Sequence, residues 1–234
     1  MTTLGDTLSA DIRKIFDTAW NTRTGQVVPK TEDIALANGA VRLDVVVLYA
    51  DLARSTQMVR KNKSTAAKIA RAYLSTMARL VTSHEGAVRS FDGDRVMGIF
   101  IGGRKNSNAG NCALKMNHVL ANVIRPQAQA KFASMKNFKI EHCVGVSTSE
   151  VLVVRGGIRD NNDLVFVGPA PNLAAKLSEI RNSPWSIYIT PHVYNRLNKK
   201  AKLASDGQNM WTTTKRKIGG EEQSLYKSKW RRKP

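Results

Sequence analysis

The sequence predicts an α+β protein with a ferredoxin-like core, in which the elements follow in the order β-α-β-β-α-β. Three observations predict this fold. Residues 42–52 form a β-branched, apolar run that is typical of a buried central strand. Two long segments, about 66–81 and 109–134, repeat apolar residues at helical spacing. Between them, Asp92-Gly93-Asp94 joins two strand-like runs as a tight hairpin.

The first 40 residues are expected to lie outside this core. Apolar residues recur at helical spacing within residues 6–20, which predicts a short amphipathic helix. Residues 21–39 contain Thr-Gly, Val-Val-Pro and Asn-Gly, which favour an irregular arm. We therefore expect a helix and arm over residues 1–40, the main domain over 41–229 and a basic tail over 230–234.

The core elements are expected in a fixed order along the chain. The first strand is followed by the first long helix, which stops before Gly86. The remaining core elements are strands 87–91 and 95–101, a polar loop over 102–108, the second long helix, and strands 138–146 and 151–154. The C-terminal additions are a short segment at 165–167, a helix over 170–181, a strand over 186–190 and a closing pair at 211–218 and 224–229.

The composition gives a large positive charge. Lys and Arg number 37 against 18 Asp and Glu, which gives a net charge of +19 and a pI near 10.3. Such a balance is expected of a phosphate binder, so nucleic acid and small polyphosphates are both candidate partners, as is a surface without a specific partner. The longest apolar run, Val45 to Ala50, is too short to cross a membrane. No secretory signal is visible and two cysteines imply no oxidising compartment, so we expect a cytoplasmic protein.

Several familiar catalytic motifs are absent from the sequence. It contains no G-x-x-x-x-G-K-[ST], G-x-G-x-x-G, G-x-S-x-G or H-E-x-x-H pattern. The four histidines are scattered without the spacing of metal ligands. The chemistry must therefore come from other residue types.

Two acidic residues are the strongest candidates. Asp51 ends the most apolar strand, and Asp94 lies in the hairpin between the next two strands. In a β-α-β-β-α-β sheet the first and third strands are neighbours, so these carboxylates come together and repel unless a cation lies between them. Mg²⁺ or Mn²⁺, completed by phosphate oxygens of a substrate, suits such a pair. The alternative is a helix cap at Asp51 and an ordinary turn residue at Asp94.

Three motifs around these acids resemble those of class III nucleotide cyclases. Residues 45–56, VVVLYADLARST, resemble the first metal motif, and residues 86–100, GAVRSFDGDRVMGIF, the second. Residues 163–177, DLVFVGPAPNLAAKL, resemble the segment that completes the site. The motifs occur in the family's order, and the resemblance covers about residues 42–228. It implies a cyclase domain that works as a head-to-tail homodimer.

The resemblance also implies roles for individual residues. Asp51 and Asp94 would hold two divalent ions, Mn²⁺ or Mg²⁺, with the backbone carbonyl of Leu52 as a further ligand. Asn172 would orient the ribose, and Lys176 occupies the position of an arginine that stabilises the pentacoordinate phosphate. Lys217 corresponds to a lysine that grips the terminal phosphates.

The sequence departs from the family at the residues that read the base. Ser90 and Val165 stand where adenylate cyclases have a lysine and an aspartate that read adenine, and Lys176 lacks the fork of an arginine. The N-terminal arm and the first motif resemble bacterial pyrimidine cyclases of anti-phage defence, which signal through cyclic UMP or cyclic CMP to a separate effector. Tyr49 shares a strand face with Asp51, so its hydroxyl is expected to contact a single-ring base. The alternative is that Tyr49 only packs in the core and that other residues read the base.

The leading interpretation is therefore a cyclase that converts UTP to 3′,5′-cyclic UMP and pyrophosphate. Cytidylate and purine cyclases are alternatives within the same family. A polymerase-like palm also sets two acids on such a sheet, but this chain has no room for the fingers and thumb. A nucleic-acid-binding ferredoxin-like domain is the main alternative outside catalysis, and it requires exposed aromatic side chains on the sheet. Tyr49 is the one clear aromatic residue on the expected face, which disfavours a specific nucleic-acid site.

Overall fold

The computed structural model describes residues 2–234, which form two compact units. One unit comprises Met1–Asp44 and Glu150–Gly168, and the other comprises Val45–Ser149 and Pro169–Pro234. Two long strands, β2 (Gly39–Ala53) and β5 (Glu141–Ile158), contribute residues to both units. The candidate site residues, apart from Val165, belong to the second unit.

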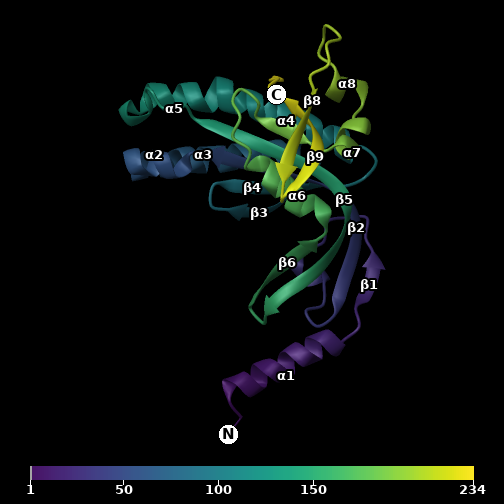
Figure 1. Ribbon diagram of the computed structural model, residues 1–234. Helices are drawn as coiled ribbons and strands as arrows, with labels where there is room; N and C mark the ends of the chain where they lie inside the picture. Colours follow the sequence, from purple (N-terminus) through teal and green to yellow (C-terminus); the bar gives the residue numbers. More distant parts are fainter. Residues whose placement is uncertain (1) are drawn as a thin grey trace. The chain divides into compact units, whose positions relative to one another are not determined.

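The second unit is built on a sheet with the strand order β3-β4-β2-β5-β7-β9-β8 (Figure 1). The further strands are β3 (Ala87–Asp92), β4 (Arg95–Phe100), β7 (Ile187–Ile189), β8 (Thr212–Ile218) and β9 (Glu221–Ser228). The first four strands of the core follow the ferredoxin-like order, with β2 antiparallel to β4. The predicted fold class is confirmed, and the strand that carries Asp51 lies next to the hairpin that carries Asp94, as predicted.

One face of this sheet packs on helices and forms the main core. Alternate residues of β2, such as Val46, Leu48 and Ala50, are fully buried in that core because strand side chains alternate between faces. The core also contains apolar residues of α3 (Lys63–Ser83) and α4 (Lys105–Val119). The remaining helices of the unit are α2 (Ser55–Lys61), α5 (Arg125–Lys131), α7 (Pro191–Asn195) and α8 (Lys199–Lys202), with a π-helical turn at Leu120–Ile124 and a 3-10 turn at Ala133–Met135.

The opposite face is covered by α6 (Pro169–Ser178) over β5 and β7. Cys143, Leu177 and Tyr188 form a smaller core there with Leu225. Gly145 permits this packing, since a methyl group at that position would lie 2.1 Å from the carbonyl oxygen of Ala174. The α6 helix thus covers the β5–β7 part of the face that Tyr49 and Asp51 share.

The first unit contains α1 (Leu4–Asp17), β1 (Asn21–Thr24) and a 3-10 turn at Thr31–Asp33. Strand β1 pairs in parallel with the beginning of β2, and β6 (Asn161–Val167) forms a hairpin with the end of β5. Of the thirteen exposed large hydrophobic side chains among residues 2–234, ten belong to this unit. Exposed apolar patches on a protein are typical of surfaces that contact another molecule.

Three local predictions were wrong. The expected arm contains strand β1, and the expected loop at 102–108 already belongs to α4 from Lys105. The strands expected at 138–146 and 151–154 are one continuous strand, β5. Polar residues between them do not end the strand, because Thr148 Oγ1 donates to the Val45 carbonyl at 2.8 Å and Ser149 Oγ accepts from the Ala170 amide at 3.1 Å.

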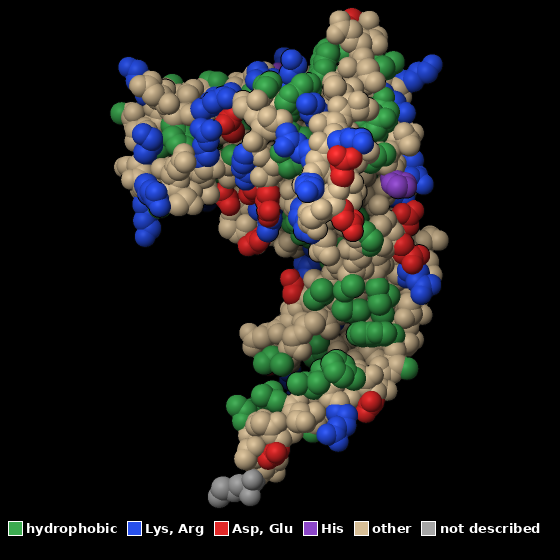
Figure 2. Space-filling view, in the orientation of Figure 1, with side chains coloured by type: hydrophobic (Ala, Val, Ile, Leu, Met, Phe, Trp, Pro, Cys, Tyr) green, Lys and Arg blue, Asp and Glu red, His purple; other side chains and the backbone are tan. Residues whose placement is uncertain are grey.

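Positive side chains occur at many places on the face of the molecule shown in Figure 2. Figure 2 shows Lys and Arg side chains distributed widely over the face in view, with Asp and Glu among them. None of the helices in residues 2–234 is long and apolar enough to cross a membrane.

Candidate active site

The site is centred on the two predicted acids, which the sheet brings together. Asp51 lies opposite Arg95 in the β2–β4 register, and the Leu52 amide donates to the Asp94 carbonyl at 3.3 Å. The Asp51 side chain is only 13% exposed. Asp94 Oδ2 is buried and has no hydrogen-bond partner within residues 2–234. The two carboxyl groups therefore lie at adjacent strand ends, as predicted.

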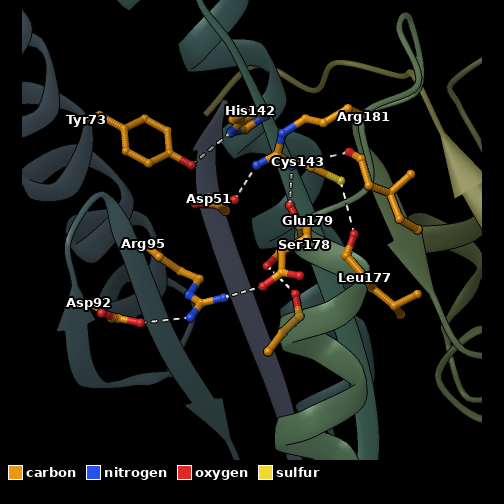
Figure 3. A network of polar contacts seen from close by, with 12 residues as sticks. Asp51, Tyr73, Asp92, Arg95, His142, Cys143, Leu177, Ser178, Glu179 and Arg181 are labelled. Carbon is orange, nitrogen blue, oxygen red and sulfur yellow. Dashed lines mark hydrogen bonds and ion pairs between the residues drawn. The ribbon is translucent and has the colours of Figure 1, made fainter. Parts of the chain in front are cut away.

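The negative charges of Asp51 and Asp94 need a nearby positive charge to compensate them. Burial raises the pKa of the Asp51 carboxyl above its ordinary value, and the Asp94 charge raises it further. Arg181, which follows α6, opposes both effects through an ion pair with Asp51 (Figure 3). Arg181 thus partly neutralises Asp51, whereas the buried oxygen of Asp94 is left without a donor.

This donor set fits a divalent cation whose coordination is completed by a substrate. No group of three or more His, Cys, Asp or Glu side chains able to hold a metal is found in residues 2–234. The chain offers two carboxylates and the nearby Leu52 carbonyl. Mg²⁺ and Mn²⁺ accept such sparse protein ligands when phosphate oxygens and waters fill the remaining positions. The orphaned Asp94 oxygen is the observation that supports this fit.

A row of side chains beside the acids crosses three strands. Tyr49 and Ser90 both lie opposite Met97 in their strand registers. The Tyr49 hydroxyl contacts Met97 Sδ at 3.1 Å, and Ser90 Oγ contacts the same sulfur at 3.8 Å. Burial raises the pKa of Tyr49, so its hydroxyl keeps the proton. The structure therefore places two of the predicted base-contacting residues on either side of Met97, with Tyr49 on the same strand as Asp51.

Asn172 and Lys176 form a second, separate group. They are four residues apart on α6 and both are exposed, whereas Ala174 and Leu177 pack inward. The Lys176 ammonium lies 2.8 Å from the position that a methyl group on Gly219 would take, at the β8–β9 turn. Lys217 lies on β8 next to this turn. Within residues 2–234, no hydrogen bond or ion pair joins this group to Asp51 or Asp94.

Comparison with known proteins identifies the family. A search of protein-family models gives no match. The chain is 41% identical over 235 residues to a uridylate cyclase from Rhodovulum sp. strain MB263, which covers 99% of this chain and 98% of that protein. It is 38% identical to a uridylate cyclase from Xanthomonas perforans, with 97% of each protein covered. This chain belongs to the uridylate cyclase family. The resemblance to class III cyclases is thereby confirmed.

Solved structures show that the fold of this uridylate cyclase family member is shared more widely. A bacterial light-regulated adenylyl cyclase superposes with a TM-score of 0.66 at 20% identity, over 82% of this chain and 53% of that one. The adenylyl cyclase CyaB from P. aeruginosa gives 0.66 at 18% identity, over 81% and 95% of the chains. At these identities the likeness concerns the fold alone.

Two cationic residues near the acids were not among the predicted site residues. Arg95 donates to Asp92 at 2.8 Å and to Glu179 at 3.1 Å, and its guanidinium lies 5.2 Å from the Tyr49 ring centroid. Arg181 reaches Asp51 across 130 positions of sequence. Figure 3 shows both guanidinium groups directed toward the acidic residues. The position of Arg95 directly after Asp94 could have indicated its role, whereas nothing in the sequence indicates that of Arg181.

Val165 is the one predicted site residue that belongs to the first unit. It is on β6 in the first unit and its side chain is 46% exposed. Its contact with a base was predicted from the family pattern and stays a prediction.

Proposed function

We propose that this chain converts UTP into 3′,5′-cyclic UMP and pyrophosphate. The observation that carries the proposal is the carboxylate pair of Asp51 and Asp94 on adjacent strands, in which Asp94 Oδ2 is buried without a donor, in a chain that shares 41% of its residues with a uridylate cyclase over nearly its full length. A sheet end with two such acids suits a reaction in which negative charge moves along a triphosphate.

The reaction forms one phosphorus–oxygen bond and breaks another. The ribose 3′-oxygen attacks the α-phosphorus, the bond from that phosphorus to the oxygen bridging the β-phosphate breaks, and pyrophosphate leaves with its electron pair. The 3′-hydroxyl proton passes to solvent. Asp51, Asp94 and the Leu52 carbonyl would hold two divalent ions, Mn²⁺ or Mg²⁺. When bound, these ions lower the pKa of the hydroxyl and offset charge on the leaving group.

A second subunit would supply the rest of the site. Asn172 would orient the ribose, Lys176 would offset charge on the reacting phosphate, and Lys217 would hold the terminal phosphates. These three residues gather around α6 and the β8–β9 turn, separate from the acid pair. A head-to-tail homodimer brings one group to face the other and creates two equal sites. The exposed apolar side chains of the first unit support such a contact.

Base selection would fall to Tyr49 and Ser90, with Val165 contributing. The Tyr49 hydroxyl is held by a weak sulfur acceptor, so a uracil edge can replace Met97 as its partner. A ring that projects from the first strand would narrow the site toward a single-ring base. The choice of UTP over CTP follows the names of the relatives.

The positive surface would serve small polyphosphates. A charge of +19 raises the local concentration of triphosphates by electrostatic steering. On the face in view in Figure 2, acidic side chains lie among the basic ones, which favours general attraction of small polyphosphates over a specific nucleic-acid partner. We expect the product to act in the cytoplasm as a second messenger on a separate effector protein, in defence against phage.

The test is product analysis with UTP and Mn²⁺, followed by mass spectrometry. Wild-type protein should release cyclic UMP and equimolar pyrophosphate, and ATP, GTP and CTP supplied separately should react more slowly. Asp94→Asn protein, prepared in parallel, should release neither product. Cyclisation of ATP or GTP as fast as UTP would contradict the pyrimidine assignment, and product from Asp94→Asn would contradict the site.

A further inference from the structure

The second unit contains a pocket of about 180 Å³ that neither Asp51 nor Asp94 lines. The proposed reaction assigns no role to this pocket. It is bordered by the loop 180–186, the beginning of β5 and residues of α4 and α5. Neither Asp94 nor Tyr49 lines it, and neither does Asn172 or Lys176. Its charged lining residues are Arg54, Arg125, Lys139, Arg181, Arg231 and the single acid Glu141. The pocket is therefore strongly basic.

The cations of the pocket are only partly compensated. Glu141 forms ion pairs with Lys139 at 2.7 Å and with Arg54 at 3.7 Å, and Arg181 forms an ion pair with Asp51. Arg125 and Arg231 form no ion pair with any residue in the described range 2–234. Arg125 Nε donates to the Ile140 carbonyl at 2.7 Å, and Arg231 reaches Asn122 Oδ1 at 3.4 Å. Two guanidinium groups are thus left without an ion pair in the described range, and Glu141 is the one acid that lines the pocket with them.

These two guanidinium groups also oppose each other. Burial lowers the pKa of Arg125 below its ordinary value, and the charge of Arg231 lowers it further, whereas Glu141 opposes both effects. Placing two like charges beside a partly desolvated pocket is costly unless an anion lies between them. The arginine fork is the side chain best matched to phosphate oxygens.

Two further residues that line the pocket each have a buried polar atom without a partner in the described range. His142 is 5% exposed, and its Nε2 has no hydrogen-bond partner within residues 2–234. Its Nδ1 lies 3.2 Å from the Tyr73 hydroxyl. When Nδ1 accepts a hydrogen bond from that hydroxyl, the neutral ring carries its own hydrogen on Nε2, which is then a donor. Ser186 Oγ is likewise buried and unpartnered in the described chain. Both residues line the pocket, and a buried polar atom without a partner is costly, so each would gain from a nearby acceptor.

We propose that this pocket binds a phosphate group, held by Arg125 and Arg231 with His142 Nε2 and Ser186 Oγ as neutral donors. The volume exceeds what one water requires and admits a small tetrahedral anion. The phosphate belongs either to the polyphosphate tail of the nucleotide and its pyrophosphate product, or to free inorganic phosphate. The pocket geometry stands independently of the proposed cyclisation.

Arg181 connects this pocket to the acid pair. Its guanidinium pairs with Asp51 and also lines the pocket, so it can turn from one anion toward the other (Figure 3). A cation on Asp51 would release Arg181 toward the pocket. An anion in the pocket would in turn draw Arg181 away from Asp51, so the two binding events favour each other.

The test is isothermal calorimetry of the full chain with sodium pyrophosphate and with sodium phosphate, with no divalent metal and no nucleotide. We expect one saturable site per chain for at least one of these anions. Arg231→Gln should weaken it at least about tenfold, because the guanidinium loses its charge and fork. Lys233→Gln removes the same charge two residues away, at an exposed position, and should change the affinity less than about twofold.

Two results would overturn the proposal. One is the absence of saturable binding of either anion to wild-type protein. The other is an equal loss in Arg231→Gln and Lys233→Gln, which would show attraction to the general positive surface. Because no turnover occurs in these titrations, neither result bears on the cyclase reaction itself.

A second set of titrations distinguishes the sources of the phosphate. Saturating UTP without metal should abolish anion binding if the pocket holds the nucleotide tail, and Arg231→Gln should then weaken UTP equally. If the pocket holds free phosphate, anion binding should persist beside UTP. Both results support the pocket as a phosphate site, and they assign its ligand.

Discussion

At the residue scale, the acid pair affects both activity and stability, and a substitution of Asp94 separates the two effects. Asp94→Asn keeps the size of the side chain but removes a charge whose Oδ2 is buried without a donor. We expect activity with UTP and Mn²⁺ to fall at least about a hundredfold, since the reaction loses a charged ligand. The thermal midpoint without metal should not fall, because repulsion with Asp51 is relieved.

The matched control for this variant is Asp92→Asn, which lies two residues earlier on β3. Its carboxylate is 73% exposed and pairs with Arg95. It should retain most of the activity, because surface ion pairs contribute little. Equal losses in both variants, or full activity in Asp94→Asn with metal still required, would contradict the role assigned to Asp94.

Tyr49 tests how the base is read. Tyr49→Phe removes only the hydroxyl, whose present acceptor is the weak Met97 sulfur at 3.1 Å. We expect kcat/KM for UTP to fall about tenfold, the value of one hydrogen bond, with little change in thermal stability. Steady-state kinetics on UTP and thermal denaturation check this. An unchanged kcat/KM would mean that the ring only packs in the sheet.

His142 predicts a pH-dependent stability. Burial and two nearby arginines lower its pKa from 6.5 to about 3, so the folded state keeps the ring neutral. The unfolded state binds the proton more readily, so stability present above pH 6.5 is lost as pH falls below it. The loss from this residue should be about 1 kcal/mol between pH 6.5 and 5.5.

Urea unfolding at the two pH values, in buffers without phosphate, measures this effect. His142→Gln should show a pH dependence smaller by that amount, since glutamine does not titrate. An identical pH dependence in wild type and His142→Gln would contradict the neutral, buried state of this ring.

The sequence could predict the residues of the acid pair but not their counter-charges. Asp51 and Asp94 were predictable together because strand order alone makes their strands neighbours. Arg181 meets Asp51 only because α6 packs over β5 and its final loop turns back toward β2, a tertiary arrangement without local signal.

At the element scale, periodicity predicted the long helices and the hairpin of β3 and β4 well. It failed where polar residues belong to regular structure. Residues 147–149 interrupt the apolar pattern, yet β5 runs through them because their hydroxyl groups find partners on neighbouring segments. Ser107 was assigned to a loop because it is polar, yet it is a buried residue of α4 and its Oγ accepts a hydrogen bond from the Asn198 amide.

Gly145 tests how closely α6 must approach the sheet. In Gly145→Ala the new methyl group would lie 2.1 Å from the Ala174 carbonyl oxygen and 2.6 Å from the Ser178 amide nitrogen. Backbone atoms of a packed helix cannot move away easily, so we expect a destabilisation of about 2 kcal/mol or more. Activity should fall as well, because Arg181 follows this helix.

Gly103→Ala is the control for this variant, since a methyl group there meets no atom within 4 Å. Urea denaturation of both proteins should show a loss of stability in Gly145→Ala and almost none in Gly103→Ala. Equal stabilities would mean that α6 sits farther from β5 than described.

At the scale of the whole molecule, the predicted site residues form two groups that lie apart in one chain. The acids and Tyr49 belong to β2 and the β3–β4 hairpin, whereas Asn172 and Lys176 belong to α6 beside the β8–β9 turn. Sequence motifs indicated the members of both groups. How the groups face each other depends on an assembly of subunits, for which a single chain's pattern carries no direct signal.

Mixing two inactive variants tests this account most directly. Asp94→Ala and Asn172→Ala proteins should each fail to cyclise UTP. After proven subunit exchange, half of the dimers are mixed and each has one intact site, so activity should return to about a quarter of the wild-type value. Cyclic UMP is measured by mass spectrometry in the mixture and in each variant alone. No recovery, despite exchange, would contradict a site shared between two subunits.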